Sequence, residues 1–378
     1  MGNILDYIDW RGDITFAERP FNDVDNLILS ELAYINMKDL IADDEYITLQ
    51  QLYERWTKSD NKPNIPLNDP TELFKKAASS IRFRNIKAGR FSEIINTEKQ
   101  LQFAAVTFMP GDGSAYISFR GTDDTLVGWR EDCNLSFLAE TPGQKEAVKY
   151  INAIAKQTSC LMRIGGHSKG GNFAVYGAAF CDKNIRERLI AVYSNDGPGF
   201  NSAIEKTEEY ITIIPKVKKI VPESSLVGIL LLSSEKRSVV KSTAKGIYQH
   251  HPYTWCVLGE DFIRTKKLSV ESALMDEALR QWLGNLSNEE KKLFVNSVFD
   301  SLEASGASTL DELNKNKLVS YNAILKAGAE FPAEKRAEIF RILKSFARAS
   351  GEVFFNEAKK IFEKALDVKQ LLPDKQDK

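Results

Sequence analysis

The segment that decides the fold reads Arg163-Ile164-Gly165-Gly166-His167-Ser168-Lys169-Gly170-Gly171-Asn172. It contains the pattern G-x-S-x-G at Gly166, Ser168 and Gly170. The apolar run 161–164 before it predicts a strand, and the small-residue run 169–180 after it predicts a helix. A nucleophilic serine on such a sharp turn is flanked by glycines because neighbouring backbone passes close by. The segment therefore predicts an α/β fold with Ser168 as a nucleophile.

A serine nucleophile needs a general base, and the chain has only three histidines. His167 adjoins Ser168, so its side chain is expected to point away from the serine hydroxyl. His250 and His251 follow the last strands expected in the sheet, which gives the order Ser-then-His of this fold. We predict His250 as the base, with His251 as the alternative; both could also be structural. A metal site on this pair and Cys256 is disfavoured because no further ligand is near.

The third member of such a triad is a carboxylate that orients the imidazole and stabilises its charged form. Asp196 closely follows the predicted strand 189–193, so we expect it at the same edge of the sheet as Ser168. The run 195–199 (Asn-Asp-Gly-Pro-Gly) is also a good turn sequence. Glu223, just after the predicted strand 217–221, is the competing acid. We predict Asp196 and leave Glu223 open.

Residues 118–124 offer donors for negative charge on a substrate. A strand that ends at Arg120-Gly121-Thr122 places backbone amides and a hydroxyl at the edge of the sheet. We expect Thr122 to donate to the oxyanion alongside the backbone amide of Lys169. Taken alone, the segment would be an ordinary charged loop.

The rest of the chain indicates two parts. Up to about residue 264 the predicted strands alternate with helices, which favours a mostly parallel sheet flanked by helices. After residue 265, apolar residues recur at helical spacing in 270–286, 288–302, 309–327 and 333–349. We therefore predict an α/β-hydrolase domain at 1–264 and a helical C-terminal region at 265–378. The apolar run Leu226–Leu232 could be a lid, an acyl pocket or core.

Composition limits the partners. The chain has 51 basic and 52 acidic residues, a formal net charge of −1, so nothing steers it toward nucleic acid. No apolar run is long enough to span a bilayer, and the N-terminus does not resemble a secretory signal. The four cysteines are scattered, which favours reduced thiols. We expect a cytoplasmic protein without cofactor, metal or integral membrane association.

These motifs together resemble the class 3 (fungal-type) lipases. The similar positions are Phe119 to Thr122, Trp129, Asp132 and the turn Gly166 to Gly171. A family of uncharacterised, mainly bacterial lipase-like proteins is more similar, over about residues 3–260. Its motifs resemble Asn3 to Tyr7, Asn195 to Phe200, Pro222 to Gly228, and Gln249-His250-x-Pro252-x-x-Trp255.

The resemblance has two implications for the site. Position 251 corresponds to Asp in the bacterial family's Gln-His-Asp-Pro pattern, which supports His250 as the base. Class 3 lipases carry their acid as an Asp before a later Val-Pro, and Lys219-Ile220-Val221-Pro222 has none. The choice of Asp196 therefore rests on the bacterial family.

The function that follows is a serine hydrolase that cleaves carboxylic esters of small molecules or lipids through an acyl-enzyme. Transfer of the acyl group to another acceptor would use the same triad. A third alternative is a non-catalytic interaction module, with a protein partner of the helical tail that the sequence does not identify.

Overall fold

The computed structural model describes residues 1–60, 69–123, 125–303, 305–309 and isolated positions between 312 and 342. The chain divides into two compact units, Met1–Leu274 and Met275–Lys378. The first unit contains the sheet and every residue discussed as a candidate for chemistry. The predicted boundary after residue 264 stays a prediction.

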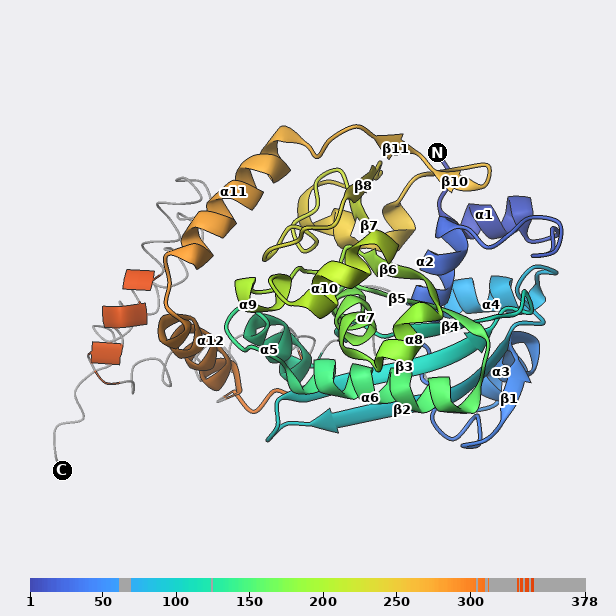
Figure 1. Ribbon diagram of the computed structural model, residues 1–378, viewed down its shortest axis with the longest axis horizontal. Helices are drawn as coiled ribbons and strands as arrows, with labels where there is room; N and C mark the ends of the chain where they lie inside the picture. Colours follow the sequence, from blue (N-terminus) through green and yellow to red (C-terminus); the bar gives the residue numbers. More distant parts are fainter. Residues whose placement is uncertain are drawn as a thin grey trace, which may run out of the picture. The chain divides into compact units, whose positions relative to one another are not determined.

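A nine-stranded sheet forms the centre of the first unit (Figure 1). Its order is β1-β2-β3-β4-β5-β6-β7-β8-β11. The central strands β4 to β8 run parallel, and the outer pairs are antiparallel. The strands are β1 (Tyr46–Thr48), β2 (Lys87–Asn96), β3 (Leu101–Met109), β4 (Ser114–Phe119), β5 (Leu161–His167), β6 (Leu189–Asn195), β7 (Val217–Pro222), β8 (Arg237–Val240) and β11 (Arg264–Thr265), with a separate ribbon of β9 (Val257–Leu258) and β10 (Asp261–Phe262).

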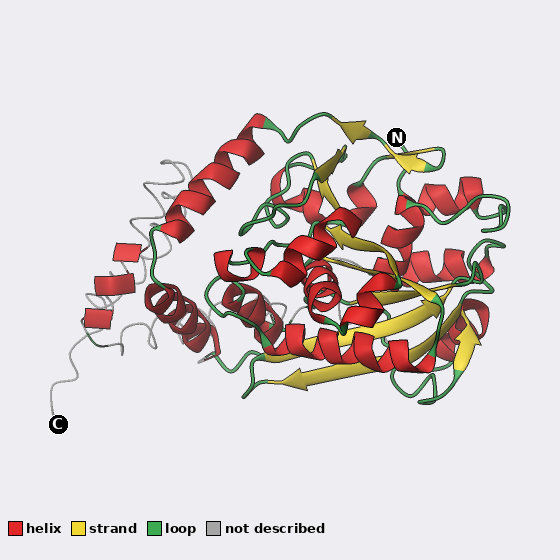
Figure 2. Cartoon of the chain, in the orientation of Figure 1, coloured by secondary structure: helices red, strands yellow, loops and turns green. Residues whose placement is uncertain are grey.

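Helices cover both faces of this sheet (Figure 2). The helices of the first unit are α1 (Ile4–Arg11), α2 (Asp23–Leu32), α3 (Leu49–Thr57), α4 (Thr71–Ser79), α5 (Leu126–Asn134), α6 (Pro142–Gln157), α7 (Lys169–Phe180), α8 (Lys183–Glu187), α9 (Ser202–Glu205) and α10 (Glu208–Ile213), with short 3₁₀ turns η1 (Ile214–Lys216), η2 (Gly246–His250) and η3 (Pro252–Thr254). Because side chains alternate along a strand, Tyr116 of β4 packs with α2 on one face and Ile117 packs with α7 on the other. The predicted α/β-hydrolase fold is confirmed.

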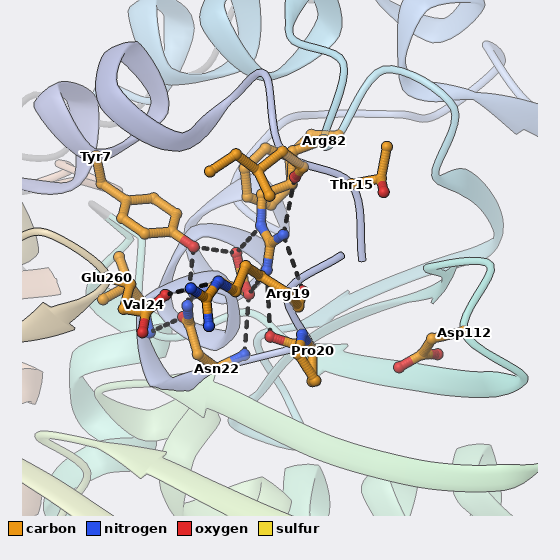
Figure 3. Close-up of polar contacts among 12 residues, drawn as sticks. Tyr7, Thr15, Arg19, Pro20, Asn22, Val24, Arg82, Asp112 and Glu260 are labelled. Atoms are coloured by element: carbon orange, nitrogen blue, oxygen red, sulfur yellow. Dashed lines mark hydrogen bonds and ion pairs between the residues drawn. The ribbon is translucent and has the colours of Figure 1, made fainter. Parts of the chain in front are cut away.

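A buried ion pair anchors the N-terminal helices to this fold (Figure 3). Arg82, after α4, donates Nε and Nη2 to the two oxygens of Asp25 in α2, at 2.8 and 2.6 Å. Tyr7 of α1 donates to the same carboxylate at 2.9 Å. The guanidinium also donates to the carbonyls of Ile14 and Arg19. These bonds satisfy a charge pair that would otherwise be costly to bury, and they hold α1, α2 and the segment after α4 together.

Two helices of the predicted C-terminal region are confirmed. These are α11 (Val270–Gly284) and α12 (Asn288–Glu303), where Ser287 and Glu290 form a reciprocal cap at the start of α12. The predicted helices 309–327 and 333–349 lie almost entirely outside the described residues. Among the described residues, no helix is both long and apolar enough to cross a membrane.

Candidate active site

Ser168 lies on the turn between β5 and α7 with φ 56° and ψ −132°. This left-handed backbone is strained for a serine, and two backbone hydrogen bonds hold it: Ser168 N donates to Asn195 O, and Gly171 N donates to Ser168 O, both at 2.9 Å. A Cβ on Gly170 would lie 2.1 Å from the carbonyl oxygen of Phe119. The tight turn predicted from G-x-S-x-G therefore has a steric reason for its glycine at 170.

His250 and Asp196 are brought together from separate loops. The Nδ1 atom of His250 donates to Oδ2 of Asp196 at 2.7 Å. Asp196 follows β6, is fully buried, and has a φ of 50°. Its other oxygen accepts from Ser225 Oγ at 2.5 Å and from Gly228 N at 3.1 Å. The carboxylate is thus fixed on both oxygens and orients the imidazole.

The alternative base, His251, and the alternative acid, Glu223, make other contacts. His251 Nδ1 accepts from the backbone N–H of Tyr253 at 3.3 Å, and its ring packs edge-on against that of Tyr253. Glu223 contributes its backbone, with its N–H donating to Val240 O at 2.9 Å. Among the residues that the structure describes, Asp196 is the carboxylate hydrogen-bonded to the His250 imidazole.

Thr122 and Lys169 belong to two segments that adjoin the serine, the loop after β4 and the start of α7. Lys169 is the first residue of α7, so its amide belongs to the positive end of that helix. A Cβ built on Gly121 would lie 3.1 Å from Ser168 Cβ, which places the loop after β4 against the serine.

The Thr122 hydroxyl already has an acceptor. Its Oγ1 donates to Asp132 Oδ2 at 2.5 Å. Desolvation raises the pKa of Asp132 to about 6. A hydroxyl has one proton, so Thr122 Oγ1 can donate to a substrate only when this bond is released or Asp132 is protonated.

His167 supports the backbone of His250. Its Nε2 donates to the His250 carbonyl at 2.9 Å, and the two imidazole centroids are 4.5 Å apart. Burial lowers the pKa of His167 well below its usual range, so the ring is neutral and Nδ1 is an acceptor. Tyr34 Oη lies 3.3 Å and Glu31 Oε1 lies 3.5 Å from Nδ1. Sequence reasoning places His167 away from the serine hydroxyl and misses this support.

A second support comes from the residues around His250. Trp255 Nε1 donates to the carbonyl of Gln249 at 2.8 Å, and the Gln249 side chain accepts from Ser224 N at 2.8 Å. The turn that carries His250 is therefore tied to the loop that carries Ser225. The spacing of Gln249, His250 and Trp255 in the sequence is the signal that could have revealed this.

The apolar run Leu226–Leu232 forms part of the loop between β7 and β8. Ile229 is buried, and the leucines are half-buried. Leu232 exchanges backbone hydrogen bonds with Phe200, and Leu230 O accepts from Gly199 N. The run therefore packs over the segment after Asp196, and Ile229 belongs to the core.

Glu31 gives the fold a measurable pH dependence. Its side chain is fully buried, and desolvation raises its pKa from 4.5 to about 8. Between these values the unfolded chain releases the proton while the folded chain keeps it, so the contribution of Glu31 to stability falls as pH rises from about 4.5 to 8. At about 1.4 kcal/mol per pKa unit, the loss amounts to several kcal/mol. The substitution Glu31→Gln is expected to remove this loss of stability, because glutamine does not titrate.

Urea unfolding of both proteins at pH 5 and pH 8, followed by tryptophan fluorescence, measures this effect. The exposed Glu208 supplies the matched control, Glu208→Gln, which should follow the wild type. Equal losses of stability in wild type and Glu31→Gln between the two pH values would show that Glu31 does not bind this proton.

Comparison with solved structures finds lipases at low identity. The Rhizomucor miehei lipase propeptide complex is 16% identical over 45% of this chain and 66% of that chain, with a TM-score of 0.32. Lip2 lipase from Yarrowia lipolytica is 10% identical over 60% and 79%, with a TM-score of 0.33. M37 lipase is 10% identical over 55% and 70%, with a TM-score of 0.36. The chain thus spans 66% of the length of the Rhizomucor lipase.

Comparison with curated proteins finds no match. The model of the Mbeg1-like family matches residues 77–300, which is more than half of the chain and includes β4 to β8 and the elements that carry Ser168, Asp196 and His250. The chain therefore belongs to the Mbeg1-like family.

Proposed function

We propose that this protein is a serine hydrolase that cleaves carboxylic esters, with Ser168 as nucleophile, His250 as base and Asp196 as the orienting acid. The observation that carries the proposal is the 2.7 Å hydrogen bond from His250 Nδ1 to the fully buried Asp196 carboxylate. Because this bond occupies Nδ1, the other ring nitrogen of His250, Nε2, would be the atom that accepts the proton of the Ser168 hydroxyl. The strained turn at Ser168 supports the same assignment.

The proposed reaction has two halves. Ser168 Oγ attacks the ester carbonyl carbon while His250 Nε2 takes the hydroxyl proton. The amide of Lys169 and the Thr122 segment would stabilise the tetrahedral oxyanion. Its collapse breaks the ester C–O bond, and His250 gives the proton to the departing alcohol. Water then attacks the acyl-enzyme, passes a proton to His250, and the carboxylic acid leaves as the proton returns to Ser168.

The first test is labelling with a fluorophosphonate, which reacts covalently with an activated serine. We expect labelling of wild type and none of Ser168→Ala. The control is Ser79→Ala, which removes an exposed serine at the end of α4 and should label like wild type. If folded wild type resists the probe, the hydrolase proposal is wrong and a non-catalytic interaction module becomes the better hypothesis.

The second test concerns the acyl group. Product analysis with p-nitrophenyl esters of two to twelve carbons, with and without added alcohols or amines, separates hydrolysis from acyl transfer. Release of free acid in the presence of acceptors supports hydrolysis, since transfer would divert the acyl group to them. A preference for acetyl esters with no gain from longer chains would restrict the proposal to an esterase.

A further inference from the structure

Lys169, directly after the proposed nucleophile, carries its charge into the interior. Its side chain has no exposed surface. Its Nζ donates to Gln102 Oε1 at 2.5 Å, to Glu131 Oε2 at 3.2 Å and to the carbonyl of Gly128 at 3.4 Å. Glu131 is also fully buried. We call Lys169, Glu131 and Gln102 the Lys169 cluster.

Each member of the Lys169 cluster also binds backbone from another element. Glu131 Oε1 accepts from Gly143 N at the start of α6, at 2.7 Å. Glu131 Oε2 accepts from the backbone N–H of Gln102 in β3, at 3.0 Å. Gln102 Nε2 lies 3.5 Å from Gly121 O and 3.3 Å from Asp123 Oδ2. The cluster thus joins α5, α6, α7 and β3 to the loop after β4.

The proposed oxyanion site has two halves, the backbone amide of Lys169 and the segment that carries Thr122. The Lys169 cluster contacts both halves. The amide of Lys169 is covalently part of the cluster. Thr122 lies between Gly121 and Asp123, the two residues that Gln102 contacts, and its hydroxyl donates to Asp132, the neighbour of Glu131 in α5. Movement within the cluster would therefore change the separation of the two halves.

Stability alone does not account for a charged pair at this place. Apolar residues of similar volume often replace a buried ion pair with no loss of stability or with a gain. Fully bonded polar networks, by contrast, restrict the interior to one arrangement. We infer that Lys169, Glu131 and Gln102 are positioning residues that hold the two halves of the oxyanion site at a fixed separation, an inference that rests on the proposed function.

The test is the double variant Lys169→Met with Glu131→Gln. It removes both charges, so neither is left buried without its partner. We expect kcat for p-nitrophenyl butyrate to fall about 10²-fold, the effect of a misplaced catalytic group, while KM changes less than about threefold. The inhibition constant of a trifluoromethyl ketone, which forms a tetrahedral oxyanion on the serine, should rise by the same factor as kcat/KM falls. If the residues had only a structural role, the variant would yield less folded protein, but kcat per folded molecule and the inhibition constant would stay at their wild-type values.

The matched control is Arg163→Met with Asp112→Asn. Arg163 lies in the N-terminal half of β5, and Asp112 lies in the turn before β4, so this control removes an ion pair away from the C-terminal end of β5 that carries Ser168. It should keep the wild-type kcat per folded molecule. A kcat within threefold of wild type in the Lys169–Glu131 double variant, or an equal fall in the control, would overturn the inference.

A second variant covers the case in which the double variant does not fold. Gln102→Met leaves the ion pair intact and removes the contacts to Gly121 and Asp123. We expect kcat to fall about tenfold with KM retained, which is a smaller misplacement of the same site; an unchanged kcat would overturn the inference. Fluorophosphonate labelling of wild type is measured in parallel, because its absence would refute the proposed function itself.

Discussion

Replacing Ser168 by alanine is expected to lower kcat for ester hydrolysis about 10⁶-fold, the typical cost of removing the nucleophile of a serine triad. The reason is chemical: alanine cannot form the acyl-enzyme, and only binding and the oxyanion donors remain. The measurement is kcat for p-nitrophenyl butyrate, with the folded fraction checked by circular dichroism.

The same experiment includes His250→Ala and the double variant Ser168→Ala with His250→Ala. Residues that act as one unit are strongly non-additive, so each single variant and the double should have similar residual rates. His251→Ala is the matched control, because His251 contacts Tyr253 and lies next to the proposed base. A large loss in His251→Ala with a small loss in His250→Ala would reverse the assignment of the base.

The second large effect concerns the acid. Asp196→Asn should keep the shape of the site but favour the wrong tautomer of His250, and such a change lowers kcat about 10⁴-fold in serine triads. Asp196 is fully buried, and Ser225 and Gly228 donate to its Oδ1 while Oδ2 accepts from His250, so both carboxylate oxygens have fixed partners. The measurement is kcat across the pH range in which a neutral histidine is the base.

Glu223→Gln is the natural control for this variant. Glu223 follows the next strand of the sheet and is the acid that sequence alone could not exclude. We expect its kcat to stay close to that of wild type, because the carboxylate hydrogen-bonded to the His250 imidazole belongs to Asp196. If instead Glu223→Gln is the inactive protein, Asp196 has a structural role and the triad must be redrawn.

The sequence predicts those parts of the fold and of the candidate site that are formed by neighbouring residues of the chain. The turn at Ser168 is predictable because its glycines, the strand before it and the helix after it are contiguous. The alternation of apolar runs and helices between 161 and 221 likewise predicts the parallel strands β5 to β7. The small number of histidines limits the candidate bases to His250 and His251, and the resemblance of the residues around His250 to the bacterial family favours His250.

Contacts between distant segments are not predictable in this way. Glu31 approaches His167 from α2, across more than 130 residues of chain, and an acidic residue in an amphipathic helix is normally expected to face water. Lys169 gives no local sign that its partner is Glu131. The hydroxyl of Thr122 is a donor in any conformation, and only the fold shows that it points to Asp132.

The clustering of the histidines has a practical consequence for spectroscopy. The chain has three imidazoles; the rings of His167 and His250 are 4.5 Å apart, and His251 is the next residue. Selective isotopic labelling of histidine would therefore make every imidazole resonance of a 42.6 kDa protein a reporter of one small region. Ligand titrations could then be followed without assigning the rest of the spectrum.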